Sequence, residues 1–384
     1  MANTLTNLIP DAYRALDVVS RELVGFIPAV QLDPSADTIA VNQNIRIPIT
    51  PSNSAGKDIT PAMSFPSAAY QTIGYVTHSI SKQRAFPFSW TQEEIKSVNN
   101  GPGYLSLQQG QIAQAIRAAV NEIEVDCAVA AKNGVSRFFG ATAGTAPVLA
   151  DFAQAQKILD DNGAPSSDRS AVFNTTAAVA LRSTSNLYKV NEAGDNGNLL
   201  RQGTLGDLYG FNLRQSAKIQ STTAGAMTGA LFNGAGAVGD TTITFDTGTV
   251  NTTGIVAGDI LSITGTTGGA QKYVVATGST SASGTIVINA PGLQAAVADN
   301  TAITVFGTSA RNVAFSRNAI VLSTRLPASV PNDLAIDRAT ITDPRSGISF
   351  ELAMYPGFRM VHFEIACAWG VTCVKSEHVA GIIG

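Results

Sequence analysis

The sequence predicts an α+β fold into which an antiparallel β-barrel is inserted. Residues 221–310 differ from the rest of the chain, because they hold 15 of its 35 glycines, 19 threonines and only five charged side chains. Short apolar-alternating runs recur in this segment, and Gly, Asn or Asp separates them at the turn spacing of a small antiparallel barrel or sandwich. Both flanks mix helical and strand-like periodicity, which predicts an α+β host.

The inserted segment should bury a core of its own. Its apolar residues alternate within each run, so one face of every strand can point inward. We therefore expect residues 222–309 to fold alone, with chain ends that lie close together. The residues expected in this core are Ile243, Phe245, Ile260, Ile263, Val274, Ile286, Ile288, Ile303 and Val305.

The composition excludes several classes of protein. A formal net charge of −3 provides no basic field for nucleic acid, and no apolar run approaches the ~18 residues of a membrane span. Charged residues make up 14% of the chain, against roughly 25% in ordinary soluble domains. Because the centres of interfaces are depleted of charge, this indicates a surface covered by other chains. We expect no signal peptide, and we expect Cys127, Cys367 and Cys373 to be reduced thiols.

The N-terminal part predicts a helix, an arm and a long hairpin loop. Residues 10–27 begin with Pro and Asp, which suit a first helical turn, and continue with apolar residues at helical spacing. Residues 45–49 alternate as a strand, and 73–80 form the next one. The polar, proline-containing segment 51–72 between them should be a protruding loop that a neighbouring subunit orders, because loops of this length are usually functional or mobile.

The longest helix is expected over residues 107–132. Ser106 and Gln109 form a capping-box pattern before it, and Asn133-Gly134 predicts a left-handed stop after it. At about 1.5 Å per residue such a helix measures roughly 39 Å and would span a domain as a spine.

Shorter elements follow in the order helix, strand, helix. We expect a helix at 151–161, a strand at 171–173, a helix at 175–185 and a loop at 191–203.

Beyond the barrel the pattern predicts closing strands. Residues 319–323 form one strand, and alternating apolar residues predict two more at 348–354 and 361–369. Pro356-Gly357 between the last two fits a type II turn.

Motifs that would carry enzyme chemistry are weak. Residues 233–239 contain G-x-G-x-x-G, but a strand pattern follows where a dinucleotide site needs a helix, so a glycine turn is the better interpretation. His78, His362 and His378 lack metal-ligand spacing. The adjacent carboxylates of Glu93-Glu94 and of Asp160-Asp161 would diverge by about 100° on a helix. There is no nucleophile elbow and no Walker loop, so we expect no enzyme activity and no cofactor.

The order of these parts resembles the major capsid proteins of tailed double-stranded DNA bacteriophages, and in particular the short-tailed-phage branch with an inserted β-barrel domain. The likeness covers nearly the whole chain in order. The segments that carry it are NEIE at 121–124, GFNLRQS at 210–216, NAIVL at 318–322, AWGV at 368–371, and Glu377 with AGI at 380–382.

The resemblance implies a domain order. This order is an N-terminal arm and first strand (1–50), an extended loop (51–75), a peripheral domain with the spine helix (76–150), a first part of an axial domain (151–221), the barrel (222–309) and closing strands of the axial and peripheral domains (310–384). It also implies an icosahedral shell of hexamers and pentamers, with a scaffolding protein and a portal protein as partners. The shell would be assembled in the host cytoplasm, would enclose DNA without reading its sequence, and would expand on maturation.

Contacts between subunits are expected at charged residues of the loop and the barrel. The candidates are Lys57, Asp58, Asp240, Asp246, Asp259, Lys272 and Asp299. Some proteins of the resembled fold join a loop lysine to an asparagine of another subunit. We expect no such crosslink at Lys57, because nothing in the sequence specifies the buried carboxylate that this chemistry needs. The alternatives are a cellular nanocompartment shell of the same fold, a secreted β-rich hydrolase, and a tail or adhesin protein.

Overall fold

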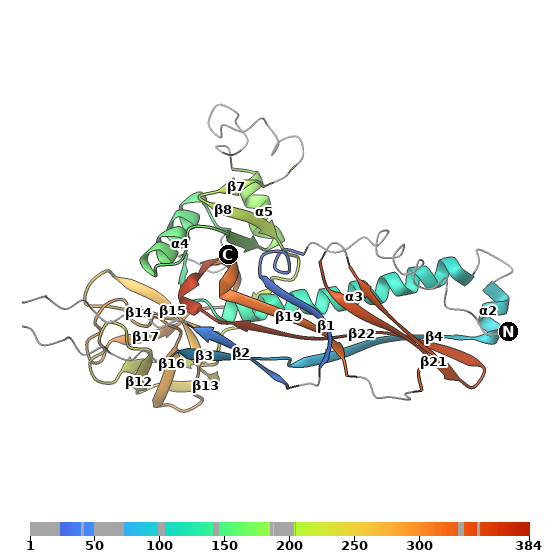
Figure 1. The fold of residues 1–384 in the computed structure, drawn as a ribbon. Coiled ribbons are helices and arrows are strands. Elements are labelled where there is room, and N and C mark those ends of the chain that lie inside the picture. The colour runs from blue at the N-terminus through green and yellow to red at the C-terminus, as the bar shows by residue number, and fades with distance from the viewer. Residues whose placement is uncertain are drawn as a thin grey trace, which may run out of the picture.

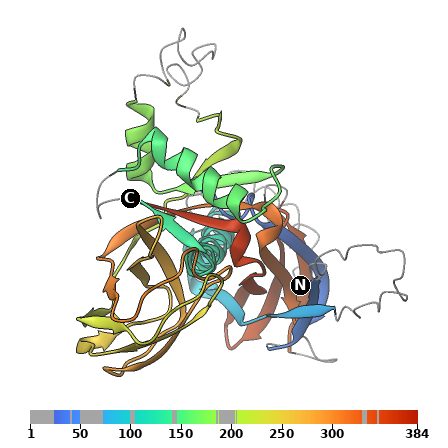
Figure 2. The same ribbon diagram turned by 90° about the vertical axis from the view of Figure 1, so that its left-hand side faces the viewer.

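The computed structural model describes residues 24–39, 42–49, 73–98, 104–140, 146–184, 187, 203, 205–328, 334–343 and 346–384. One long helix, α3 (Tyr104–Asn133), runs beside a long sheet, with a β-barrel at one end and a smaller α/β part projecting from the side (Figure 1). In the view along this helix, the three parts surround it (Figure 2). The helix therefore contacts every layer of the molecule.

Helix α3 is longer than its apolar pattern predicts. It has 30 residues, which corresponds to about 45 Å, and it includes Ser106. The predicted capping box is therefore wrong, since Ser106 lies inside the helix. The helix does end at Asn133, but Gly134 does not adopt a left-handed conformation. A glycine is required there for another reason, because a Cβ would collide with the Cys373 side chain.

The long sheet combines strands from both ends of the chain. Its order is β1 (Gln31–Ile39), β19 (Ile320–Pro327), β22 (Met360–Cys373), β21 (Ser349–Gly357) and β20 (Asp337–Thr342), and β4 (Lys82–Thr91) also pairs with β22. Only the β1–β19 pair is parallel. Strand β4 and the short helix α2 (Gln92–Val98) were not predicted.

The hairpin of β21 and β22 turns two residues later than expected. Pro356 pairs with Val361 and Gly357 with Met360, so both lie within β21. Phe358 and Arg359 form the turn, in which Arg359 has a φ of 55°. The predicted Pro-Gly turn is wrong, because cross-strand pairing extends through both residues.

The smaller α/β part is built on a second sheet. Helices α4 (Leu149–Asp161) and α5 (Thr175–Arg182) confirm two predicted helices. The sheet contains β5 (Arg137–Phe139), β23 (Val379–Ile383), β18 (Ser309–Ser316), β6 (Arg169–Phe173), β8 (Phe211–Gln215) and β7 (Asp207–Leu208), and β9 (Ser221–Thr222) pairs with β18. Two short 3₁₀ turns, Arg317–Ala319 and Ser376–His378, precede β19 and β23. Strand β18 is central, because it joins the barrel exit to this sheet.

Six antiparallel strands close into a barrel. They are β11 (Ala230–Phe232), β12 (Thr242–Asp246), β14 (Ile260–Thr264), β15 (Ala270–Thr277), β16 (Gly284–Ile288) and β17 (Ala302–Val305). The order β14-β17-β11-β12-β16-β15 becomes a ring because β14 also pairs with β15. Strands β10 (Ala226–Thr228) and β13 (Thr249–Gly254) pair separately. Thr222 lies opposite Ser309, so the two ends of the segment are neighbours, as the sequence predicts.

The N-terminal predictions are tested only in part. Strands β2 (Asn44–Ile49) and β3 (Gly74–Ser79) pair as an antiparallel hairpin, which confirms the two expected strands. Residues 24–27, the end of the helix predicted at 10–27, are in coil and turn. The rest of that helix, the loop at 51–72 and nearly all of 191–203 lie outside the described residues.

Candidate functional site

The barrel shares a sheet with its host. On β15, Lys272 lies opposite Phe138 and Tyr273 opposite Arg137 of β5, so the barrel wall continues into the second sheet. This pairing satisfies backbone groups that would otherwise form an open sheet edge. The barrel is therefore attached to the host by hydrogen bonds between strands, as well as by the two segments through which the chain enters and leaves it.

The barrel also closes the end of the long helix. The side-chain amide of Asn289 donates to the carbonyl oxygens of Asn133 and Val135, both at 2.7 Å. The last carbonyls of a helix have no partner within the helix, so a side chain from elsewhere must satisfy them. Nothing local in the sequence marks Asn289 for this role, because it lies more than 150 positions from its acceptors.

The residues expected in the barrel core lie in two different cores. Ile243, Phe245, Ile263, Ile286, Ile288 and Ile303 are buried inside the barrel, and Val305 packs against them. Ile260 and Val274 instead belong to the main host core with helix α3. Their assignment to a private core is wrong, because β14 and β15 present one face to the barrel interior and the other to the host. The barrel interior also contains residues that were not predicted, among them Phe232, Leu261 and Tyr273.

One candidate contact residue lies in the interior. Asp259 is 1% exposed, and its carboxylate accepts hydrogen bonds from the backbone N–H groups of Gly225 (3.0 Å) and Val256 (2.8 Å). A buried carboxylate that is bonded in this way organises the turn at the barrel entrance. It cannot contact another subunit directly, so that expectation is corrected.

The other barrel candidates lie nearer the surface. Asp240 and Asp299 are exposed; Asp240 accepts the backbone N–H of Ala237 in its own turn, and Asp299 accepts that of Gly234, 65 positions away. Asp246 is half-buried. The Lys272 ammonium lies 5.3 Å from the centre of the Phe306 ring, and burial lowers its pKa. Lys57 and Asp58 lie outside the described residues, so the loop contacts stay predictions.

A buried glutamate attaches the N-terminal segment to the long helix. Glu124 is fully buried, and its carboxylate accepts the N–H groups of Gly25, Phe26 and Ile27 at 2.7–3.1 Å. The Ser216 hydroxyl also donates to it at 2.7 Å. The sequence contained a signal for this role, because Glu124 continues the i, i+4 series of Ile116 and Val120 on the apolar face of the helix. A charge on such a face needs partners from another part of the chain.

Large apolar side chains are exposed at the extremities of the described structure. Phe358, in the β21–β22 turn, is 90% exposed. Ile73 and Tyr75, beside and within β3, are 69% and 56% exposed. Single exposed apolar residues are ordinary, but an almost fully exposed aromatic ring on a long projecting hairpin is a candidate contact with another chain.

Residues 233–239 are followed by strand β12 and not by a helix, in agreement with the glycine-turn interpretation. Among the described residues, no three His, Cys, Asp or Glu side chains gather in a way that could hold a metal ion. No helix in the part of the chain covered by the structure is long and apolar enough to cross a membrane.

Comparison with known proteins gives matches at the level of structure. No protein-family model matches the sequence, and no curated protein does. The solved capsid structure of cyanophage P-SCSP1u aligns over 95% of this chain and 90% of its own, with a TM-score of 0.53 and 10% identity. A solved structure of Mycobacterium phage Che8 aligns over 94% of this chain and 92% of its own, with a TM-score of 0.51 and 14% identity. Over nearly its whole length, the chain therefore has the mixed α+β fold of a phage capsid protein.

Proposed function

We propose that this chain is the major capsid protein of a tailed double-stranded DNA phage. Many copies would assemble into an icosahedral shell of hexamers and pentamers that encloses the genome in the virion. The observation that carries the proposal is the match to the solved cyanophage capsid structure, which covers 95% of this chain and 90% of that structure's own chain. The role is structural and needs no catalytic group.

The surface chemistry fits this role. A shell subunit contacts neighbours in slightly different environments, which favours a rigid core with contacts on projections. The β21–β22 hairpin and the turns that contain Asp240 and Asp299 are projections of this kind. A net charge of −3 also suits a container wall, since a basic wall would bind DNA phosphates.

The finer steps belong to the same proposal. A scaffolding protein would template a procapsid in the host cytoplasm, a portal protein would occupy one vertex, and DNA entry would expand the shell. The barrel at 222–309 would act as an inserted domain that stabilises the host and presents loops to neighbouring capsomers. The hydrogen bonds from Asn289 and the β15–β5 pairing support the first of these two barrel roles.

Electron microscopy of the purified chain tests the assembly. Expression alone and together with a co-encoded scaffold should give closed shells of uniform diameter in at least one case. Particles from an infected host should also contain nuclease-protected double-stranded DNA, which separates a capsid from a nanocompartment. Dispersed monomers under both expression conditions, accompanied by hydrolase activity, would contradict the proposal.

A further inference from the structure

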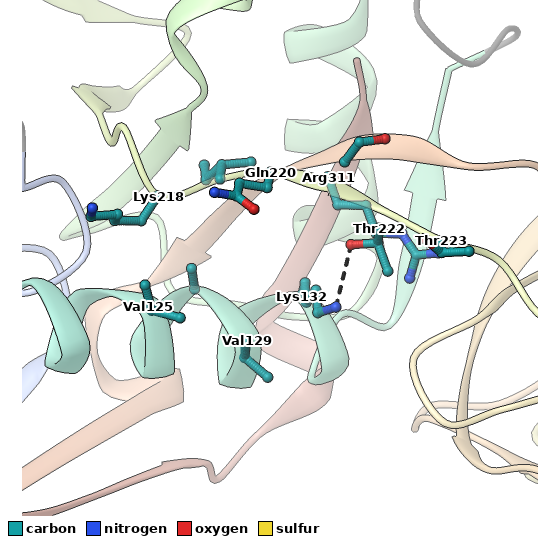
Figure 3. Close-up of a pocket in the computed structure, with 11 residues that line it drawn as sticks. Val125, Val129, Lys132, Lys218, Gln220, Thr222, Thr223 and Arg311 are labelled. Atoms are coloured by element: carbon teal, nitrogen blue, oxygen red, sulfur yellow. Dashed lines mark hydrogen bonds between the residues drawn. The ribbon is translucent and has the colours of Figure 1, made fainter.

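A cavity lies where the barrel joins the host. It has a volume of about 360 Å³ and lies between the last turns of helix α3 and the segment 218–223 that leads into the barrel. The helix contributes Val125, Val129 and Lys132, and Arg311 of β18 lines it from the opposite side (Figure 3). Its lining contains three cationic side chains, those of Lys132, Lys218 and Arg311, and no acidic one.

Arg311 is unusual because its charge is buried and only partly satisfied. The side chain is 2% exposed, and one of its terminal N–H groups donates to the Gly258 carbonyl. The guanidinium atoms Nε and Nη2 have no hydrogen-bond partner. Buried guanidinium donors without an acceptor are costly, so a site of this kind favours an anionic ligand, such as a carboxylate or a phosphate, that offers two oxygens to the two donors.

Lys132 adds a second cation at the same end of the cavity. Its ammonium lies 3.3 Å from the Thr222 hydroxyl, and Figure 3 shows the Arg311 guanidinium beside that threonine. Burial lowers the pKa of Lys132, and the nearby Arg311 charge lowers it further, while Asp259 opposes the shift. Asp259 does not line the cavity, and both of its oxygens already accept backbone N–H groups. The two cations therefore share one carboxylate that is already bonded.

The rest of the wall is partly apolar, because Val125, Ala128, Val129 and Ile219 line it together with the polar Gln220, Ser221 and Thr223. Val125 and Val129 lie between the Lys132–Arg311 end and Lys218, which lies at the far end in Figure 3. The cavity is several times larger than one phosphate or carboxylate group. Glu122 and Asp126 lie in an adjoining hollow, where they pair with Arg84 (3.7 Å) and Lys82 (2.7 Å).

The geometry points to an oxyanion-binding site at the barrel–host junction. A phosphate or carboxylate group binds between Lys132 and Arg311, where the Thr222 hydroxyl supplies a further donor. The apolar group that carries the oxyanion lies along Val125 and Val129 toward Lys218. A ligand there would link helix α3, the barrel entrance and β18, the three elements that meet at the junction.

The test uses the full chain and simple anions at constant ionic strength, with chloride as the reference. Inorganic phosphate should raise the melting temperature more than chloride does. Phenyl phosphate should bind several-fold more tightly than phosphate in calorimetry, because its ring can occupy the apolar wall. Comparing the binding affinities of phenylacetate and phenyl phosphate then shows whether the site prefers a carboxylate or a phosphate.

Matched variants locate the site. Lys132→Gln should weaken binding by about tenfold, the loss expected for one charge-assisted hydrogen bond, and Lys218→Gln should weaken it less. Lys157→Gln makes the same change on the exposed face of helix α4, away from the cavity lining, and should alter binding by less than about twofold. Two results would overturn the site: phosphate acting no differently from chloride, or Lys157→Gln weakening binding as much as Lys132→Gln. Equal binding of phosphate and phenyl phosphate would overturn the role of the apolar wall.

Discussion

At the scale of single residues, buried polar groups connect parts of the chain that are distant in sequence. Glu124 joins residues 25–27 to residue 216, across separations of more than 90 positions. His78 and Asp259 are likewise buried and bonded to distant segments. A buried polar group is tolerated only when its partners are in place, so these residues favour one arrangement of the host over others.

Replacing Glu124 tests the attachment of the N-terminal segment. Glu124→Gln substitutes an amide donor for one oxygen that now accepts a backbone N–H, so two donors would face each other. We expect a loss of about 1.5–3 kcal/mol in the free energy of unfolding, measured with urea. Glu93→Gln, on the exposed first turn of α2, should change it by less than about 0.5 kcal/mol. Equal losses in the two variants would contradict this role for Glu124.

Because of His78, we expect the free energy of unfolding to fall at acid pH. Burial lowers the pKa of this histidine; the nearby Asp33 charge opposes this shift, and the Arg325 charge adds to it. The Nδ1 atom of the ring lies 2.8 Å from the Thr372 hydroxyl, and the Nε2 atom has no hydrogen-bond partner. Because its pKa is lower in the folded state, the unfolded chain binds the proton more readily. The stabilising contribution is therefore present above the unfolded pKa, near 6.5, and is lost as the pH falls below it.

The measurement is the free energy of unfolding between about pH 5 and pH 8, where histidines titrate. The wild-type chain should lose more stability toward the acid end than His78→Asn does. His378, whose pKa burial also lowers, is present in both proteins and cancels in the difference. Parallel pH profiles for the two proteins would exclude His78 as the cause.

At the scale of elements, the junction of barrel and host determines how independent the barrel is. Its ends are neighbours, and it has a buried interior of its own, as an insertion requires. Yet β15 pairs with β5, and Ile260 and Val274 pack into the host core. The barrel and helix α3 should therefore stabilise each other.

Asn289 is the most direct test of this coupling. Asn289→Ala removes both hydrogen bonds to the end of α3, and the loss should be about 1–3 kcal/mol in the intact chain. Asn251→Ala, on the exposed face of β13, is the matched control and should be close to neutral. If both substitutions are neutral, water replaces the Asn289 amide at no cost and the coupling depends on packing alone.

A fragment of residues 222–309 tests the independence of the barrel. We still expect cooperative thermal unfolding, because six strands close around a common interior. Ile260→Thr should cost about 1–3 kcal/mol in the full chain but little in the fragment, where the outer face of β14 is exposed to water. Ile286→Thr, inside the barrel, should destabilise both. If Ile260→Thr destabilises the fragment as much as the full chain, Ile260 packs in the barrel core and not in the host core.

At the scale of the whole molecule, the elongated arrangement along α3 leaves projections that one chain cannot cover. The β21–β22 hairpin carries Phe358 at its turn, and its 90% exposure is large for an aromatic side chain. In a shell, such a ring would be buried against a neighbouring copy. Burying a side chain of this kind contributes roughly 1.5–3 kcal/mol, and the effect is repeated at every subunit contact.

Phe358→Asp should therefore reduce the yield of closed shells without unfolding the subunit. The free energy of unfolding should change by less than about 0.5 kcal/mol, because the ring has few contacts within the chain. Phe358→Tyr keeps the ring and should assemble nearly as well as the wild type. Sedimentation and electron microscopy give the shell yield. Equal yields of closed shells from Phe358→Asp and Phe358→Tyr would show that the hairpin does not contact a neighbouring subunit.

Most of the local elements and the type of fold followed from the amino-acid sequence alone, although β4 and α2 did not. Alternating runs between glycine turns specify the barrel strands, and the 3.6-residue period specifies α3, because both patterns depend on neighbours within a few positions. It also indicated the insertion, through the change in composition at residues 221–310. Boundaries shifted where local preference was weak, as at Ser106 and Pro356, where continued helix or strand pairing prevailed.

Which side chains are buried, and in which core, depended on how the elements pack together. Asp259 was expected at the surface but is enclosed by the barrel entrance, and Ile260 faces the host core. Asn289 binds the end of α3, and Arg311 lines the cavity at the junction, because the barrel packs against that end of the helix. The contacts of Arg311 and Asn289 join residues about fifty and more than 150 positions apart. No periodicity encodes such contacts, because they arise from how whole elements pack against one another.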